Sequence, residues 1–264
     1  MTTVFGAEEH FWAADSRWTF KNAGRGVDDH QTRKVISAHG ELTFFAGDEH
    51  PILVQQASIL DLISHDQYLM LATHLVGEEY EMLVVAEQDG TIIDADLVNP
   101  YRCPRPNIDL GLMYLGSGGV YACDFFYYSH KKPYRSYDGC NVVGAMRYAS
   151  YRDDATGGNV SYQVWQPGSF AGNISSPSSY LSYNDESYNS YVKGKIDYLQ
   201  SLLEGNDMER LSASSAANSA LASTMSSVAV SEKGSGLRKV SLSSEIDRLQ
   251  RRLARRKGAN NQGL

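Results

Sequence analysis

The sequence predicts an α+β fold in which helices cover antiparallel sheets. Three observations favour this class. Strand-like segments dominate the first half of the chain, two helical segments follow between residues 120 and 151, and an alternating strand returns at residues 159–165. The dipeptide Asp89-Gly90 is a strong hairpin signal, because it readily adopts the tight turn that joins antiparallel strands. The 264 residues, 42% of them hydrophobic, suffice for one large domain with a sizeable core.

The individual elements follow from local patterns. Short apolar segments bounded by turn residues predict strands at residues 2–5, 11–15, 33–36, 41–46, 81–87, 91–93 and 113–115. Apolar residues recur at helical spacing over residues 52–63, and Pro51 fits the first turn, so we expect one helix there. Two further helices are expected at residues 120–129 and 138–151.

The composition divides the chain into four parts. Residues 2–167 form the predicted core domain, and residues 168–210 form a Ser/Tyr-rich extension with a short helix. Residues 211–241 are a predicted low-complexity linker. Residues 242–257 form a predicted basic amphipathic helix.

This last helix has two different faces. Its narrow apolar stripe consists of Leu242, Ile246, Leu249 and Leu253, and its other faces carry Arg248, Arg251, Arg252, Arg255 and Arg256. Such a helix could pair with another copy, dock on an acidic partner, contact anionic lipid, or remain a solvated basic tail.

Charge and cysteine content exclude several classes of function. Residues 237–264 hold eight Lys/Arg and two Asp/Glu, which leaves 16 basic against 29 acidic residues elsewhere, a net charge of −13. An acidic body argues against nucleic acid as the main ligand. We expect a cytoplasmic protein without a membrane span or secretory signal, since no long apolar segment is present and three widely spaced cysteines suit a reducing compartment. The histidines show no metal-ligand spacing, and no Gly-rich nucleotide loop occurs, so neither metal nor cofactor is expected.

The chain start offers a possible nucleophile. Removal of Met1 would leave Thr2 with a free α-amino group beside its hydroxyl. Such an amine titrates near pH ~8, so part of it is neutral at pH 7 and can accept the hydroxyl proton. Threonine paired with its own N-terminal amine is a known activated nucleophile. Met-Thr also begins many ordinary proteins, so this dipeptide alone decides nothing.

Five segments in order strengthen this interpretation. They are Met1-Thr2-Thr3-Val4, Ala14–Thr19, Arg33-Lys34-Val35 with Phe45–Asp48, Gly116–Ala122, and Arg152–Gly158. Together they resemble the proteasome β-subunit family of N-terminal nucleophile hydrolases, including its bacterial relative that works with an unfoldase. The resemblance covers roughly residues 2–165. It implies a four-layer αββα sandwich of antiparallel sheets, followed here by a C-terminal extension.

The resemblance also implies an activity. It points to a threonine endopeptidase that cleaves polypeptides inside a ring-type homo-oligomer, with an ATP-dependent unfoldase as a possible partner. Thr2 would attack the peptide carbonyl, and the charge of Lys34 would favour the neutral amine and the developing alkoxide. Asp15 would hold Lys34 charged, and the N–H of Gly47 would point into the oxyanion position. Without the resemblance, Asp15, Lys34 and Gly47 would be ordinary turn or strand-end residues.

A second group would surround the Thr2 amine. The resemblance assigns this hydrogen-bonding role to Ser117, Asp153 and Thr156, with Thr156 standing where the family usually has serine. Asp154 is the neighbour that could be mistaken for Asp153. Taken alone, Ser117 and Thr156 would be loop and cap residues.

The substrate pocket departs from the family pattern. By resemblance it includes Trp18, Thr19 and Phe45, but the family usually has a small residue where Trp18 stands. A tryptophan there could fill the pocket, belong to the core, or form an interface plug. For this reason a catalytically silent structural or assembly protein with the same fold is the alternative. A small-molecule amidase of this fold is a third reading.

Overall fold

The structure is a computed structural model of the chain. It describes residues 3–19, 26–28, 30–95, 98–102, 111–130, 141–165, 178–180, 185–204 and 238–261. Thr2, the predicted nucleophile, and most of the predicted linker lie outside these residues.

One sheet contains six strands, and all of its pairs are antiparallel. In spatial order they are β12 (Ser178–Tyr180), β11 (Val160–Val164), β2 (Phe11–Asp15), β1 (Val4–Ala7), β10 (Leu112–Leu115) and β9 (Asn99–Pro100). The hairpin of β1 and β2 lies at its centre, so the start of the chain is built into the middle of the molecule.

The second sheet is also antiparallel. Its strands are β13 (Arg238–Lys239), β7 (Glu79–Ala86), β6 (Glu41–Gly47) and β5 (Val35–Ala38), with β8 (Ile92–Asp94) paired to β7. A small separate pair consists of β3 (Trp18–Thr19) and β4 (Gly26–Val27). The predicted hairpin around Asp89-Gly90 is confirmed by the pairing of β7 with β8, and the predicted antiparallel α+β class is confirmed as well.

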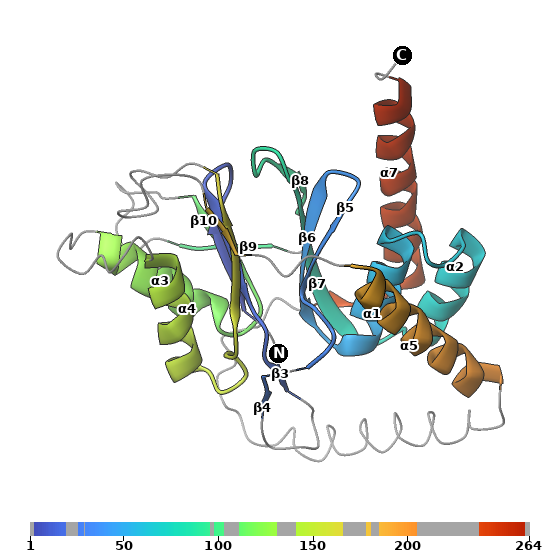
Figure 1. Ribbon diagram of the computed structural model, residues 1–264, viewed down its shortest axis with the longest axis horizontal. Helices are drawn as coiled ribbons and strands as arrows, with labels where there is room; N and C mark the ends of the chain where they lie inside the picture. The colour runs from blue at the N-terminus through green and yellow to red at the C-terminus, as the bar shows by residue number, and fades with distance from the viewer. Residues whose placement is uncertain are drawn as a thin grey trace.

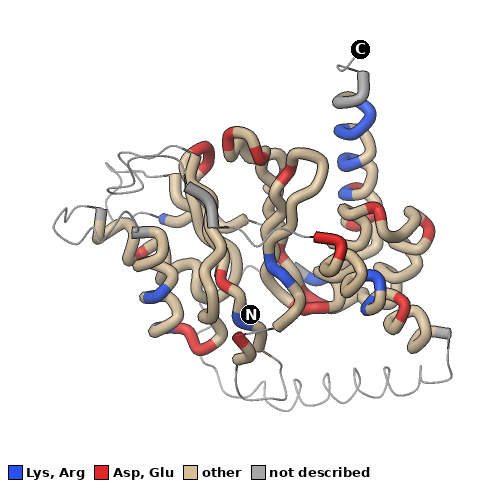
Figure 2. The backbone as a smooth tube through the Cα atoms, in the orientation of Figure 1, with Lys and Arg blue, Asp and Glu red and all other residues tan. Residues whose placement is uncertain are grey.

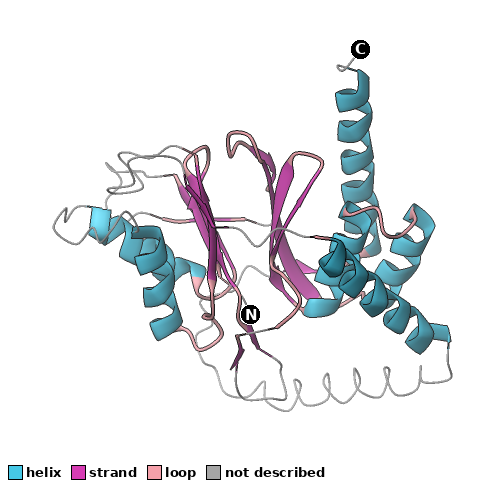
Figure 3. Ribbon diagram, in the orientation of Figure 1, coloured by secondary structure: helices cyan, strands magenta, loops and turns pink. Residues whose placement is uncertain are grey.

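The two sheets lie face to face, with helices on their outer sides (Figures 1 and 3). Helices α3 (Gly119–His130) and α4 (Asn141–Arg152) cover the first sheet, and α1 (Glu49–Ile59), α2 (His65–His74), α5 (Glu186–Glu204) and α7 (Leu242–Asn261) lie beside the second. Three apolar clusters follow this arrangement. One fills the space between the sheets, with Val4, Trp12 and Leu115 from the first sheet meeting Phe44 and Leu83 from the second. The other two lie between each sheet and its helices.

The expected single helix over residues 52–63 is wrong. Helix α1 ends at Ile59, and Asp61 has a positive φ of 56°, which an α-helix does not permit. Ser64 then begins α2 with a reciprocal cap, because its hydroxyl accepts from Gln67 N and its own N–H donates to the Gln67 side chain. Ile63 lies in the turn between α1 and α2 and packs against the same apolar cluster as these helices. It therefore matches the helical spacing of apolar residues without being part of a helix.

The first half of helix α7 packs against the body of the protein. This half is therefore neither a solvated tail nor available for binding a partner. Leu249 and Leu253 pack into the cluster beneath α1 and α2, and Glu245, Arg248 and Arg252 are buried. The expectation that Arg248 and Arg252 lie on an exposed face is therefore wrong. Three further arginines of α7 meet the chain's own acidic residues. Arg251 and Arg255 pair with Asp94 or Glu41, and Arg256 pairs with Asp61. Figure 2 shows the basic residues along this helix. The basic helix thus docks on an acidic surface of its own chain.

Candidate active site

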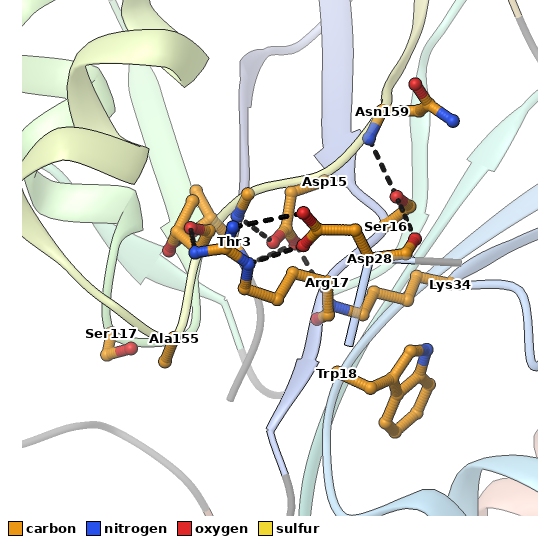
Figure 4. A network of polar contacts seen from close by, with 12 residues as sticks. Thr3, Asp15, Ser16, Arg17, Trp18, Asp28, Lys34, Ser117, Ala155 and Asn159 are labelled. Carbon is orange, nitrogen blue, oxygen red and sulfur yellow. Dashed lines mark hydrogen bonds and ion pairs between the residues drawn. The ribbon is translucent and has the colours of Figure 1, made fainter. Parts of the chain in front are cut away.

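A buried ion pair lies where the two sheets meet the chain start (Figure 4). Asp15 is the last residue of β2, and Lys34 directly precedes β5. Lys34 Nζ lies 3.1 Å from Asp15 Oδ1, and both side chains are only 1% exposed. Lys34 also donates to the carbonyl of Arg17, and Asp15 Oδ2 accepts from Gly157 N at 2.8 Å. These hydrogen bonds offset the large cost of removing two charges from water.

Burial acts on both partners of the pair. It lowers the pKa of the Lys34 ammonium, although the nearby Asp15 carboxylate opposes this shift. Burial likewise raises the pKa of Asp15, while Lys34 and the N–H groups of Thr3 and Gly157 oppose the rise. Each charge of the pair thus offsets part of the burial cost of the other.

Thr3 connects this pair to a second group of polar residues. Its N–H donates to Asp15 Oδ1 at 2.9 Å, and its carbonyl accepts from Asp15 N at 3.0 Å. The antiparallel register of β1 and β2, with Val4 opposite Ala14, produces this match. Thr3 is fully buried, and its hydroxyl lies 2.5 Å from that of Thr156.

The second group gathers around the carboxylate of Asp153. Ser117 Oγ donates to Asp153 Oδ2 at 2.6 Å, and Thr156 Oγ1 donates to the same oxygen at 2.8 Å. Because a hydroxyl carries a single proton, donation by Thr156 to Asp153 leaves Thr156 to accept the proton of Thr3. Asp154, the possible alternative to Asp153, is exposed.

Three further residues build this site, although no role was predicted for them from the sequence. They are Thr3, Arg17 and Gly118, and all three lie inside the matched segments. Arg17 binds the loop after α4, since its Nη1 donates to Thr156 O at 3.0 Å. Gly118 allows close packing, because a Cβ added there would lie 2.1 Å from Thr3 Oγ1 and 2.2 Å from Thr156 Oγ1. Two of these residues could have been identified from the sequence, because Arg17 lies in the Asp-Ser-Arg segment and Gly118 lies in the Gly-Ser-Gly-Gly segment.

Gly47 stands at the end of β6, on the strand next to Lys34. Phe45 N donates to Lys34 O at 2.9 Å, which places Gly47 two residues along from this contact. Its φ is +126°, and a Cβ there would lie 2.4 Å from Glu79 O, so only glycine fits. The oxyanion role assigned to Gly47 remains a prediction.

The predicted pocket residues lie in different surroundings. Trp18 is buried in the cluster of the second sheet together with Phe45, which is fully buried. The Trp18 indole donates to Thr32 O at 2.8 Å, and its ring centroid lies 5.2 Å from Lys34 Nζ. Thr19 pairs with Gly26 in the small two-stranded sheet. Trp18 is therefore a core residue that also covers Lys34, and the assignment of these three residues to a substrate pocket remains a prediction.

A cavity of about 680 Å³ lies next to the ion pair. Asp15 and Lys34 contribute to its lining, so a molecule bound there would lie near both. None of the described residues group into a cluster of His, Cys, Asp or Glu that could hold a metal ion. In the described part of the chain, no helix is both long and apolar enough to cross a membrane.

Comparisons with known proteins place the fold in context. No protein-family model matches the sequence, and no curated protein matches it either. The structure is similar to solved proteasome β-like proteins at low sequence identity. Eukaryotic HslV from Trypanosoma brucei is 16% identical with a TM-score of 0.38, and the match covers 62% of this chain and 98% of that one.

Two other solved proteins give similar values. Thiobacillus denitrificans BPH in complex with epoxomicin is 15% identical with a TM-score of 0.39, and the match covers 64% of this chain and all (100%) of that one. The Anbu complex from Pseudomonas aeruginosa, a helical assembly, is 15% identical with a TM-score of 0.36 and coverages of 77% and 96%. These identities and TM-scores are low, so only the residues of the site carry an argument about function. The chain is structurally similar to proteasome β-like proteins.

Proposed function

We propose that the protein is a threonine-type peptidase of the N-terminal nucleophile class, with a four-layer αββα sandwich. Removal of Met1 would expose Thr2 as the nucleophile. The observation that supports this most directly is the buried Asp15–Lys34 pair hydrogen-bonded to Thr3, the residue next to Thr2. One peptide bond separates Thr2 from Thr3, so consecutive Cα atoms are only ~3.8 Å apart. The Asp15–Lys34 pair is therefore bound to the residue that directly follows the proposed nucleophile.

Lys34 would activate this nucleophile electrostatically. An ammonium has three N–H donors, and two of them go to Asp15 and the Arg17 carbonyl. The third can donate to the Thr2 hydroxyl oxygen and stabilise the alkoxide that forms during attack. The positive charge also disfavours protonation of the nearby α-amine, which keeps the amine available as a base.

The network of Ser117, Asp153 and Thr156 would position that base. Thr3 connects this network to the Asp15–Lys34 pair, because its N–H binds Asp15 and its hydroxyl meets Thr156. Hydrogen bonds from these groups would orient the amine, directly or through one water, within reach of the Thr2 hydroxyl. Attack on a peptide carbonyl would give a tetrahedral intermediate with its oxyanion at Gly47 N–H. The C–N bond would then break, the proton taken up by the α-amine would pass to the leaving amine, and an acyl ester on Thr2 would remain. Water would add to this ester, and its cleavage would release the acid and restore the Thr2 hydroxyl.

Assembly and partners belong to the same proposal. We propose a ring-type homo-oligomer in the cytoplasm that admits unfolded polypeptides, supplied by an ATP-dependent unfoldase. Since α7 packs on its own chain, we expect the protein truncated after residue 236 that stays in solution to keep the oligomer size of the intact protein. Size-exclusion chromatography with light scattering measures this size, and a smaller particle would assign assembly to the C-terminal segment.

Intact-mass spectrometry tests the proposed nucleophile. We expect the purified protein to lack Met1 and to gain one adduct on treatment with epoxomicin, the compound in the BPH complex. Thr2→Ala is the matched control and should gain none. A full-length mass without any adduct would support the second candidate, a catalytically silent structural protein. The specific observation behind that candidate is Trp18, whose buried ring covers Lys34.

A further inference from the structure

The cavity beside the ion pair is a cleft, open to solvent on one side, that three separate parts of the chain line. Its walls are formed by Asp28 and residues 30–35, by Asn159 and Ser161 at the start of β11, and by the first turns of α5 at Ser187, Tyr188 and Tyr191. Helix α5 belongs to the C-terminal extension, outside the region that resembles the hydrolase family. The extension thus forms one wall of a cavity whose floor includes Lys34.

Hydrogen bonds hold the α5 wall in place. The Tyr188 hydroxyl donates to Gln56 Oε1 at 2.6 Å and accepts from Arg33 N at 2.9 Å. The Tyr191 hydroxyl lies 2.9 Å from Thr32 Oγ1. Both tyrosines are therefore fixed to the residues that directly precede Lys34, and the cavity is preorganised.

The charged residues of the lining already have partners of opposite charge. These pairs are Lys34–Asp15 at 3.1 Å, Arg17–Asp28 at 2.6 Å and Arg33–Asp185 at 3.8 Å. Burial lowers the pKa of His30, which favours its neutral form beside Glu49. A charged ligand would have to compete with these pairs and lose hydration as well. The cavity therefore disfavours both acidic and basic groups.

Uncharged polar side chains complete the lining. Those of Gln31, Asn159, Ser161 and Ser187 make no hydrogen bond to the described residues, and the Asn159 amide points away from its neighbours in Figure 4. Amide and hydroxyl groups both donate and accept hydrogen bonds, so they match a carboxamide. We propose that this cavity is a substrate subsite that selects a glutamine or asparagine side chain next to the cleaved bond, with α5 of the C-terminal extension as its outer wall.

This inference rests on the proposed peptidase function, so its test separates the two. Ser187 is exposed at the start of α5, and Ser187→Trp would fill the cavity while leaving the core intact. Ser190→Trp, on the same helix but outside the cavity lining, is the matched control. Epoxomicin labelling of the parent protein and of Ser190→Trp reports whether Thr2 is a nucleophile, without changing the proposed subsite.

Hexapeptide amides carrying Gln, Glu, Lys or Leu at each position in turn report on the subsite. At one position we expect Gln to be favoured over Glu and Lys by about tenfold in kcat/KM, the effect of about one neutral hydrogen bond. Ser187→Trp should reduce this preference to within about twofold by raising KM, and Ser190→Trp should leave it unchanged. A preference that is absent, or that survives Ser187→Trp, would overturn the subsite.

Equilibrium binding keeps the subsite testable even if Thr2 is not a nucleophile. The same hexapeptide amides can be titrated into the Thr2→Ala protein and into Thr2→Ala with Ser187→Trp. Preferential binding of the Gln peptide that disappears with Ser187→Trp supports the subsite independently of catalysis. Equal binding of all peptides to both proteins contradicts it.

Discussion

At the scale of single residues, the Asp15–Lys34 pair is the most demanding feature of the molecule. Both side chains are only 1% exposed, and their charges are tolerated because the carboxylate and the ammonium pair with each other. Backbone groups of Thr3, Arg17 and Gly157 complete the hydrogen bonds of the pair. Such pairs add little net stability compared with apolar residues, so stability alone does not explain them. The proposed peptidase function would account for the pair, because it needs a cation beside the chain start.

We expect Lys34→Met to abolish epoxomicin labelling and to lower the free energy of unfolding by ~3–5 kcal/mol, because Asp15 is left buried without its partner. The double variant Asp15→Asn with Lys34→Met removes both charges, so it should regain much of the stability but none of the labelling. Urea denaturation and intact-mass spectrometry measure the two effects. Unchanged labelling of Lys34→Met would contradict the role assigned to the lysine.

The pH dependence of Lys34→Met follows from Asp15. Burial raises the pKa of Asp15, and in this variant the opposing charge of Lys34 is lost. The native state then binds a proton that the unfolded state releases above pH ~4. Stability is therefore greatest below that pH and is lost as the pH rises through the native pKa. Denaturation series in several buffers should show this decline, and a rise over the same range would contradict it.

Gly118→Ala tests the packing between Thr3 and Thr156. The added Cβ would lie about 2 Å from both hydroxyl oxygens, so the hydroxyl chain must separate. We expect a loss of ~1–3 kcal/mol in stability and reduced epoxomicin labelling. Gly194→Ala is the control, since nothing lies within 4 Å of its added Cβ and alanine favours a helix. Normal labelling of Gly118→Ala would show that the exact position of Thr3 does not matter.

At the scale of elements, helix α7 is held by a buried polar cluster. The Glu245 carboxylate accepts from Gln55, Tyr68 and Tyr80, and Arg248 pairs with it at 2.7 Å. Burial, together with the adjacent Glu245 charge, raises the pKa of Tyr68, so this hydroxyl stays a donor at ordinary pH. The helix is thus bound by specific hydrogen bonds in addition to its leucines.

We expect Glu245→Ala to reduce the free energy of unfolding by ~3–5 kcal/mol, because Arg248 would remain buried without its carboxylate. Asp247→Ala removes an exposed acid of the same helix and should change stability by no more than ~0.5 kcal/mol. Urea denaturation monitored by circular dichroism compares the two. Equal effects would mean that the charge of α7, and not this cluster, governs its docking.

At the scale of the whole molecule, Glu81 connects the two sheets. It lies on β7, is fully buried, and accepts from Gly116 N at 2.6 Å and from the Asn99 side chain at 3.3 Å. Gly116 directly follows β10 and leads into Ser117 and Gly118, so this contact fixes the loop of the candidate site to the opposite sheet. Glu81 therefore stabilises both the packing of the two sheets and the loop of the candidate site.

Glu81→Ala would leave a buried backbone N–H without this acceptor, and we expect a loss of ~1–3 kcal/mol in stability together with slower epoxomicin labelling. Glu81→Gln keeps an acceptor oxygen in place and should behave more like the parent protein. The labelling rate, followed by intact mass over time, is the decisive measurement. A normal labelling rate in Glu81→Ala would show that the loop of the candidate site does not depend on this contact with the opposite sheet.

Local patterns predicted the parts of the fold that depend on neighbouring residues. The strands around Asp89-Gly90 and the helices after Gly119 are examples, since turn chemistry and periodicity act within a few residues. The break between α1 and α2 was missed because the apolar spacing continues across it. The burial of Arg252 was missed because its partners, Ser58 and Gln55, lie almost 200 positions away.

The candidate site shows the same limit. Asp15, Lys34, Ser117, Asp153 and Thr156 were singled out through ordered segments that resemble a family, and the structure brings them into two connected groups. Thr3 and Gly118 gained their importance only from contacts with residues far along the chain. The short helix of the extension was predicted, but its place as a wall beside Lys34 was not, because Tyr188 and Tyr191 meet residues 32, 33 and 56, which are far away in the sequence.

The pairing of β13 with β7 has a consequence for solubility. Strand β7 would otherwise present unpaired amide and carbonyl groups along the outer side of its sheet, a surface to which strands of other molecules can add. β13 covers one end of this border at Glu79 and Tyr80, and β8 covers the other at Val84 and Val85. Proteolytic loss of the C-terminal segment would uncover the first end, so the clipped chain should aggregate more readily than the intact one.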